Sequence, residues 1–183
     1  MDRIEILVFG QTEEQVQSNY EYTSDYNKEF FRKLRVFLYE NSIQKNMKLN
    51  LYTTNTRGLG FTAITTGISL KNEFEDFIPL IQIEVISPDK MNDWTYSDLD
   101  TYSRLSNLVD KSQTVKSSDE QWAKAGIRLV DKSDIVIIAT PKRKIVAISE
   151  VMRYAFNNNK KVYRYDEETK EFKEVSFVEL MLY

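Results

Sequence analysis

The chain has 183 residues, 42% of them hydrophobic and 29% charged, which is the size and composition of one globular domain. It contains no cysteine and no histidine, so thiol nucleophiles, Ser-His-Asp triads, disulfide scaffolds and zinc sites built from these residues are excluded. A formal net charge of −3 argues against bulk nucleic-acid binding, and the lack of a long apolar segment argues against a membrane span. Because a secreted disulfide scaffold is excluded, we expect a cytoplasmic protein.

Five short segments rich in branched and aromatic residues are predicted to form strands. They are residues 4–9, 48–53, 80–86, 134–139 and 161–165. The fourth segment includes a continuous apolar run at 135–139, which is typical of a central strand covered on both faces of a parallel sheet.

Apolar side chains at spacings of three and four predict helices between these strands. The predicted helices are residues 26–43, 61–70, 97–109, 119–130 and 145–156. Alternation of strands and helices favours right-handed crossovers, so we expect a single α/β domain over 1–183. Its architecture is a three-layer, Rossmann-like, mostly parallel sheet with helices on both faces. Residues 166–183 are expected to form a small C-terminal extension packed on the body, entered through a hairpin.

The loops after the strands are the candidate binding segments, because ligands of open parallel sheets bind beyond the carboxyl ends of the strands. The loop at 53–60 combines small hydroxyl residues, one Asn, one Arg and two Gly. Gly58 and Gly60 suit close approach of the backbone to an anion, and Arg57 could contact phosphate or carboxylate. Alternatively, Asn55 or Thr56 caps the next helix and Arg57 is solvated.

Two further segments allow two interpretations each. Three cations at 142–144 begin a predicted helix, where their interaction with the helix macrodipole is unfavourable. A bound anion would make this arrangement favourable; alternatively, solvent and salt screen the three charges. Trp94 and Tyr96 follow the third strand, where aromatic rings either stack on a ligand or pack a long loop onto the body.

The order of these motifs resembles the SLOG superfamily, a Rossmann-like nucleotide-binding group that includes the lonely-guy phosphoribohydrolases and the DprA-type fold. The YpsA-like branch is the most similar. The resemblance covers residues 4 to about 166 and rests on the strand ending at Phe9-Gly10, the turn at 53–62, Ser87-Pro88, the stretch 122–139 and Val151-Met152-Arg153-Tyr154-Ala155.

The chain departs from the pattern of this family at three places. Gly60 stands where the family has an acidic residue, Ala125-Gly126 where it has Arg-Asn, and Val146-Ala147-Ile148 where it has Gly-Gly-Thr. A loop without glycine cannot wrap a phosphate as closely, since each Cβ pushes the backbone N–H groups away. The chain thus resembles the fold of the family better than its chemistry.

The resemblance and the loop residues together predict a module that binds a nucleotide or a nucleotide-derived small molecule, as a sensor or a sequestering protein. The expected ligand-binding residues are Gly10, Gln11, Thr54, Asn55, Thr56, Arg57, Gly58, Gly60, Ser87, Thr140, Arg143 and Lys144. No metal and no cofactor are expected.

Two other functions remain open alternatives. One is an N-glycosidic hydrolase of nucleotides with Glu150 as the catalytic carboxylate, paired with Arg143 or Arg57, and with Asp89 or Asp93 as substitutes. The other is a DprA-like module for single-stranded DNA or protein, which the net charge disfavours. The family also implies pairing through helices into a homodimer or higher oligomer. The numerous aromatic residues exceed what one small core needs and fit such an interface; alternatively, they cover the long loop.

Overall fold

The computed structural model describes residues 2–10, 25–74, 80–139, 146–166, 169–176 and 179. These residues contain the strands β1 (Arg3–Gly10), β2 (Lys48–Thr54), β3 (Ile81–Pro88), β4 (Lys111–Val115), β5 (Ile135–Ala139), β6 (Lys161–Asp166) and β7 (Glu171–Glu174). The helices are α1 (Asp25–Asn41), α2 (Leu59–Phe74), α3 (Tyr96–Ser106), α4 (Asp119–Lys132), α5 (Val146–Asn157) and the 3-10 turn η2 (Ile43–Lys45). Within this part of the chain, none of the helices has the length and apolarity that crossing a membrane requires.

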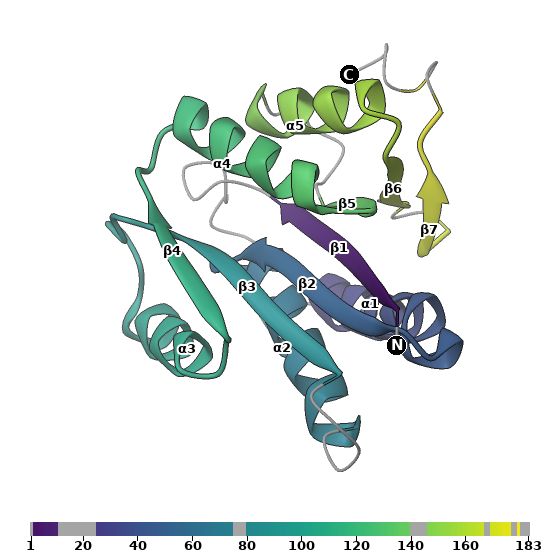
Figure 1. The fold of residues 1–183 in the computed structure, drawn as a ribbon. Helices are drawn as coiled ribbons and strands as arrows, with labels where there is room; N and C mark the ends of the chain where they lie inside the picture. Colours follow the sequence, from purple (N-terminus) through teal and green to yellow (C-terminus); the bar gives the residue numbers. More distant parts are fainter. Residues whose placement is uncertain are drawn as a thin grey trace.

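The strands form one sheet in the order β4-β3-β2-β1-β5-β6-β7 (Figure 1). All neighbours are parallel except β6 and β7, which pair antiparallel. The predicted α/β class, the mostly parallel sheet and the C-terminal hairpin are therefore confirmed. From β1 the chain runs outward through β2 and β3 to β4, then returns to β5 on the other side of β1. This reversal places a topological switch point between β1 and β5.

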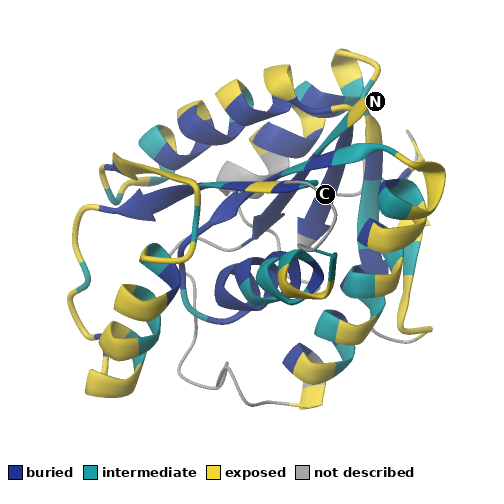
Figure 2. Ribbon diagram, turned by 60° about the horizontal axis from the view of Figure 1, so that its bottom comes forward, coloured by how far each residue is buried: buried dark blue, intermediate teal, exposed yellow. Residues whose placement is uncertain are grey.

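Helices cover both faces of the sheet, as the sequence predicts (Figures 1 and 2). Helices α1, α2 and α3 pack on one face, where Ile6 and Val8 of β1 are buried. Helices α4 and α5 pack on the other face, against Leu7 and Phe9. Consecutive β1 residues thus enter opposite cores, which explains why a central strand needs a continuous apolar run.

Strand β4 is the element that the sequence prediction missed. Four of its five residues, all but Val115, are exposed, so its sequence Lys-Ser-Gln-Thr-Val has no apolar pattern. Pairing with β3, with Lys111 opposite Glu84 in register, supplies its structure. The third helix was predicted to extend to residue 109, but α3 ends at Ser106, and the Asp110 carboxylate accepts a hydrogen bond from the Ile83 N–H (2.8 Å) ahead of β4.

An aromatic cluster joins the C-terminal hairpin to α1. The rings of Phe30 and Phe37 meet Tyr163, Tyr165 and Phe172 of β6 and β7 at centroid distances of 5.0–5.7 Å. Phe30 and Tyr165 are buried in this cluster, and Phe37, Tyr163 and Phe172 are partly buried, so these aromatic residues pack the hairpin against α1. Most of the predicted C-terminal extension after residue 176 lies outside the described residues.

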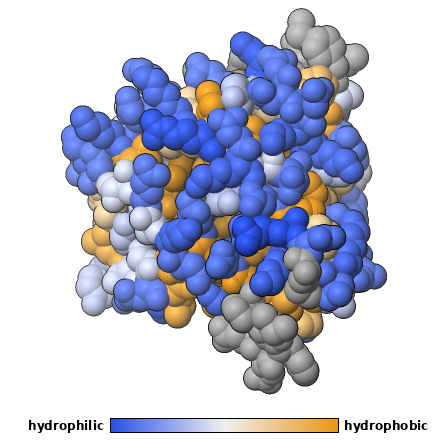
Figure 3. Space-filling model, in the orientation of Figure 1, coloured by the Kyte–Doolittle hydropathy of each residue, from blue (hydrophilic) through white to orange (hydrophobic). Residues whose placement is uncertain are grey.

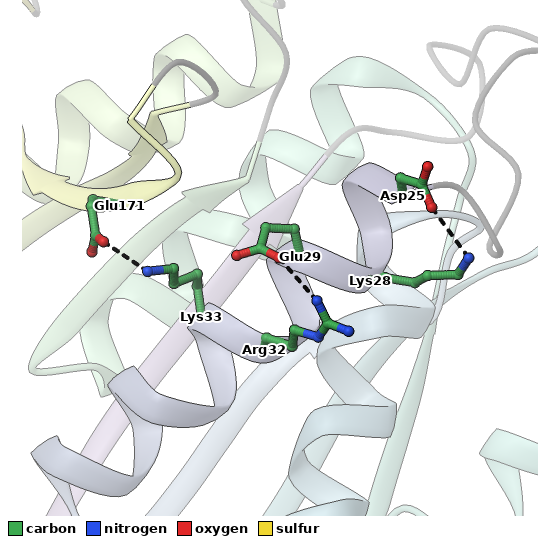
Figure 4. Close-up of polar contacts among 6 residues, drawn as sticks. All are labelled: Asp25, Lys28, Glu29, Arg32, Lys33 and Glu171. Carbon is green, nitrogen blue, oxygen red and sulfur yellow. Dashed lines mark hydrogen bonds and ion pairs between the residues drawn. The ribbon is translucent and has the colours of Figure 1, made fainter.

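Ion pairs lie along α1, and that of Lys33 with Glu171 reaches the hairpin (Figure 4). Lys33 Nζ lies 2.7 Å from Glu171 Oε1 of β7, and this hydrogen bond raises the pKa of Lys33. The pairs Asp25–Lys28 and Glu29–Arg32 are local to the helix and solvent-exposed, so each contributes little to stability. The Lys33–Glu171 pair links α1 to β7 beside the aromatic cluster.

Gly126 sets the distance of α4 from β1 and α5. A Cβ at this position would lie 2.6 Å from Val151 Cγ2 and 2.9 Å from the Phe9 ring, both fully packed. We predict that Gly126→Ala lowers the free energy of unfolding, measured by urea denaturation, by about 1–3 kcal/mol through overpacking. Helix propensity alone would give the opposite sign, by about 1 kcal/mol. The exposed substitution Lys124→Ala is the control; a stabilised Gly126→Ala would contradict the packing argument.

Candidate functional site

The carboxyl ends of the central strands form one rim, which is where open parallel sheets bind their ligands. Gly10, the last residue of β1, pairs in register with Ala139, the last residue of β5. Thr54 ends β2 on the other side of β1, and Ser87 lies near the end of β3. The predicted site residues Gln11, Thr140, Arg143 and Lys144 lie outside the described residues.

The loop from β2 to α2 is buried and closely packed. Thr53, Thr54, Asn55 and Thr56 are at most 1% exposed, and the hydroxyls of Thr54 and Thr56 lie 2.9 Å apart. A Cβ at Gly60 would lie 2.5 Å from the Thr54 carbonyl oxygen, so only glycine lets α2 begin so near the loop. Gly60 thus has a packing role within the chain, besides the ligand approach that the sequence suggests.

Asn55 does not cap α2 through its side chain. Its Nδ2 donates to Ser106 Oγ at the end of α3 (2.8 Å), and its backbone N–H donates to the Ile86 carbonyl (2.8 Å). Its Oδ1 is buried without a hydrogen-bond partner. Leaving a buried acceptor unsatisfied costs about 1–3 kcal/mol, so this loop carries polar atoms beyond what its own structure uses.

Arg57 is held by the segment between β3 and α3 and is not simply solvated. Its guanidinium lies 5.6 Å from the centroid of the Trp94 ring and 3.6 Å from Asp98 Oδ2. Asp98 also closes a capping box with Thr95 at the start of α3. A cation over an aromatic face, beside a carboxylate, fixes the loop against the helix.

Trp94 packs the loop onto the body, and Tyr96 does not. Trp94 is 8% exposed and makes edge contacts with Phe61 and Tyr102 at 5.7 and 5.5 Å between centroids. Tyr96 is 86% exposed in the first turn of α3. Of the two interpretations of these aromatic residues, loop packing fits Trp94.

Hydroxyl groups partner the polar residues at the end of β3. The Ser87 hydroxyl lies 3.0 Å from that of Ser112 in β4. The Asp89 carboxylate accepts hydrogen bonds from the Ser117 N–H (2.8 Å) and hydroxyl (2.9 Å), which lower the pKa of Asp89. Ser117 thus ties the end of β3 to the segment before α4.

Glu150, the predicted catalytic carboxylate, is exposed on α5. Helix α5 covers one face of the sheet, whereas Arg57 contacts the first turn of α3, which packs on the opposite face. The pairing of Glu150 with Arg57 stays a prediction, and its pairing with Arg143 involves a residue outside the described ranges. Among the described residues, no three acidic side chains gather closely enough to hold a metal ion.

No family model matches this chain, and no curated protein matches it either. The Rossmann-like α/β architecture therefore rests on the structure itself, and the narrower SLOG and YpsA-like resemblance stays a prediction.

A polar trough on the sheet is a feature that sequence reasoning missed. It has a volume of about 270 Å³ and lies over the amino-terminal halves of β1–β3, beside the end of α4; its main residues are Arg3, Glu5, Asn50, Tyr52, Glu84 and Lys132. Alternation was the available signal: the first halves of β1, β2 and β3 alternate polar and apolar residues, which marks a strand with one uncovered face.

The contact of Asp89 with Ser117 gives a pH prediction. A carboxyl group with a lowered pKa stabilises the fold above its unfolded pKa of about 3.9, and that contribution is lost as the pH falls through the folded value. We expect Ser117→Ala to move the pKa of Asp89 part of the way back to its ordinary value, because the hydroxyl donor is lost and the backbone donor remains. Carboxyl carbon-13 NMR titration measures this. Ser118→Ala, which removes a hydroxyl that caps nothing, should leave the pKa unchanged; an equal response in both variants would refute the assignment.

Proposed function

We propose that the protein binds a nucleotide or a nucleotide-derived small molecule at the carboxyl rim of the sheet. The observation that carries the proposal is the reversal of strand order at β1, with β2 on one side and β5 on the other. In open α/β sheets, ligands bind in the crevice outside such a switch point. Gly10 and Ala139 flank it in register, and both carboxyl-end loops start there.

The start of α2 supplies the chemistry that an anionic ligand needs. The helix has 16 residues, and its first N–H groups give positive potential near the end of β2. Gly58, with φ of 71°, adopts the left-handed conformation that turns the chain into α2. A polar loop of three threonines and one asparagine leads into this turn, and Asn55 Oδ1 is an acceptor without a partner.

Arg57 is the cation through which a phosphate group would bind at this place. Its ion pair with Asp98 is long, 3.6 Å between NH1 and Oδ2, and the side chain retains 21% exposure. A phosphate offers shorter, bidentate contacts to guanidinium and would compete with Asp98. Ligand binding would then release Asp98 for its capping role alone.

The missing glycine and acidic motifs favour binding over turnover. In the SLOG pattern, both elements belong to the phosphate loops, and this chain has Gly60 and Val146-Ala147-Ile148 in their place. We infer a degenerate member of the YpsA-like branch, acting as a sensor or sequestering module. The N-glycosidic hydrolase stays an untested alternative because no contact of Glu150 supports it.

Calorimetric titration of the full chain with nucleoside mono-, di- and triphosphates and ADP-ribose derivatives tests this proposal. We expect at least one compound to bind, and Arg57→Ala to weaken that compound roughly tenfold or more, the effect of losing a hydrogen bond to a charged group. The control is Arg104→Ala, which removes the same charge from an exposed position in the last turn of α3. Circular dichroism verifies that both variants fold.

Two results would count against the proposal. One is the absence of binding over the whole panel. The other is equal weakening by Arg57→Ala and Arg104→Ala, which would show that only the overall charge of the protein matters.

A further inference from the structure

The polar trough lies on the part of one sheet face that, among the described elements, α4 and α5 leave uncovered. In Figure 1 these two helices lie over β1, β5 and β6, and the amino-terminal halves of β2 and β3 face the viewer without a helix in front of them. Figure 3 shows that this face of the molecule is largely hydrophilic. The trough is thus a concavity on the face of the sheet, at the opposite end of the strands from the proposed nucleotide site.

Strand register arranges the trough in two rows. Glu5, Asn50 and Gln82 pair in register on β1, β2 and β3 and form the first row. Tyr52 and Glu84 form the second, one pleat nearer the carboxyl ends. At about 4.8 Å between neighbouring strands, the first row spans about 10 Å, the size of a small metabolite.

The charges lining the trough balance. Arg3, Lys111 and Lys132 are opposed by Glu5, Glu84 and Asp110, three of each sign. A ligand with a large net charge of either sign would therefore be repelled by half of the lining. A molecule that carries both charges is the electrostatic complement.

Two of the three carboxylates are already closely paired. Glu84 Oε1 lies 3.0 Å from Lys132 Nζ, and Asp110 Oδ1 lies 2.9 Å from Lys71 Nζ. The Glu5 carboxylate is different, because the side-chain contacts that its oxygens make are long: 3.3 Å from Asn50 Nδ2, 3.4 Å from the Tyr52 hydroxyl and 3.9 Å from Arg3 NH1. Glu5 is therefore the carboxylate with the most bonding capacity left.

Arg3 and Glu5 lie on the same face of β1, two residues apart. Their side chains retain 55% and 24% exposure, and their 3.9 Å separation is too long for a hydrogen bond. An ammonium group can take a short charge-assisted bond to Glu5 while a neighbouring carboxylate takes the bidentate fork of Arg3. One α-amino acid headgroup satisfies both at once.

The trough already holds an alkylammonium group of the chain itself. Lys132 Nζ lies 5.5 Å from the centroid of the Tyr52 ring and is paired with Glu84, which raises the pKa of Lys132. Tyr52 is 5% exposed, and burial, with the charge of Glu5, raises the pKa of its hydroxyl. The phenol stays protonated at neutral pH and donates toward Glu5, beside the place where the ligand ammonium would lie.

We propose that this trough binds a free α-amino acid, or another small zwitterion with adjacent ammonium and carboxylate groups, with the ammonium on Glu5 and the carboxylate on Arg3. The volume of about 270 Å³ lies just below the range typical of drug-sized ligands, which suits a molecule of this size. The remainder of the ligand extends over Asn50 and Gln82. This site is separate from the carboxyl rim and stands whether or not a nucleotide binds there.

Nitrogen-15 correlation NMR of the full chain, titrated singly with the standard L-amino acids, tests the proposal. We expect shifts in the backbone amides of Glu5, Asn50 and Gln82 for at least one amino acid. For that amino acid, two matched compounds follow: the amine without its carboxylate and the acid without its ammonium. The affinity for each of these compounds should be lower by roughly tenfold or more, since each lacks one charged hydrogen-bonding group.

Two variants with matched controls complete the experiment. Glu5→Gln and Arg3→Gln should each weaken binding roughly tenfold. Glu120→Gln and Arg128→Gln make the same charge changes at exposed positions of α4 and should leave the affinity unaltered. The proposal is overturned if no amino acid shifts these amides, if the amine alone binds as well as the zwitterion, or if the control variants weaken binding as much as the trough variants.

Discussion

The double-sided burial of β1 is the constraint on which the rest of the structure depends. Ile6 and Val8 enter one core, and Leu7 and Phe9 enter the other; all four are at most 1% exposed. A strand buried on both faces needs a neighbour on each edge to satisfy its backbone, and β2 and β5 supply them. The chain moves outward from β1 to β4 and then returns to place β5 at the other edge of β1. Right-handed crossovers therefore put helices on one face of the sheet before this return and on the other face after it.

This division of helices has a direct consequence for the exposed surface. Among the described residues, α1, α2 and α3 cover one face of the sheet and α4 and α5 cover the other, where the first halves of β2 and β3 have no described helix in front of them (Figure 1). The strand sequences match this distribution of helices. Asn50 and Gln82 alternate with buried apolar residues in the part that no described helix covers, whereas the consecutive residues Val85 and Ile86 are both buried where helices lie on both faces. The same topology therefore creates both the switch point and the trough.

The sequence predicts the fold where burial alone determines an element. The run at 135–139 identifies a central strand because it is short and rich in β-branched residues, and a strand covered on both faces needs an apolar side chain at every position. Strand β4 escaped because its polar residues acquire their conformation from β3, and no local pattern records a partner about 27 residues away. Arg57 illustrates the same limit for the site. Its position in a loop after a strand is visible in the sequence, but its contact with Asp98 depends on where α3 begins.

The two polar regions of the molecule differ in how far the chain satisfies its own groups, and this difference bears on recognition. At the carboxyl rim, Ser87, Asp89 and Arg57 have partners within the chain, so a ligand that binds these three residues must replace existing contacts. In the trough, the contacts of the Glu5 carboxylate with Asn50 and Tyr52 are long, so a ligand would add bonds and displace little. Binding at the rim would therefore be coupled to rearrangement of the loop before α3, whereas binding in the trough would occur on a preformed sheet. Such a rigid site suits selection by headgroup geometry, and the rim suits a response that moves a loop.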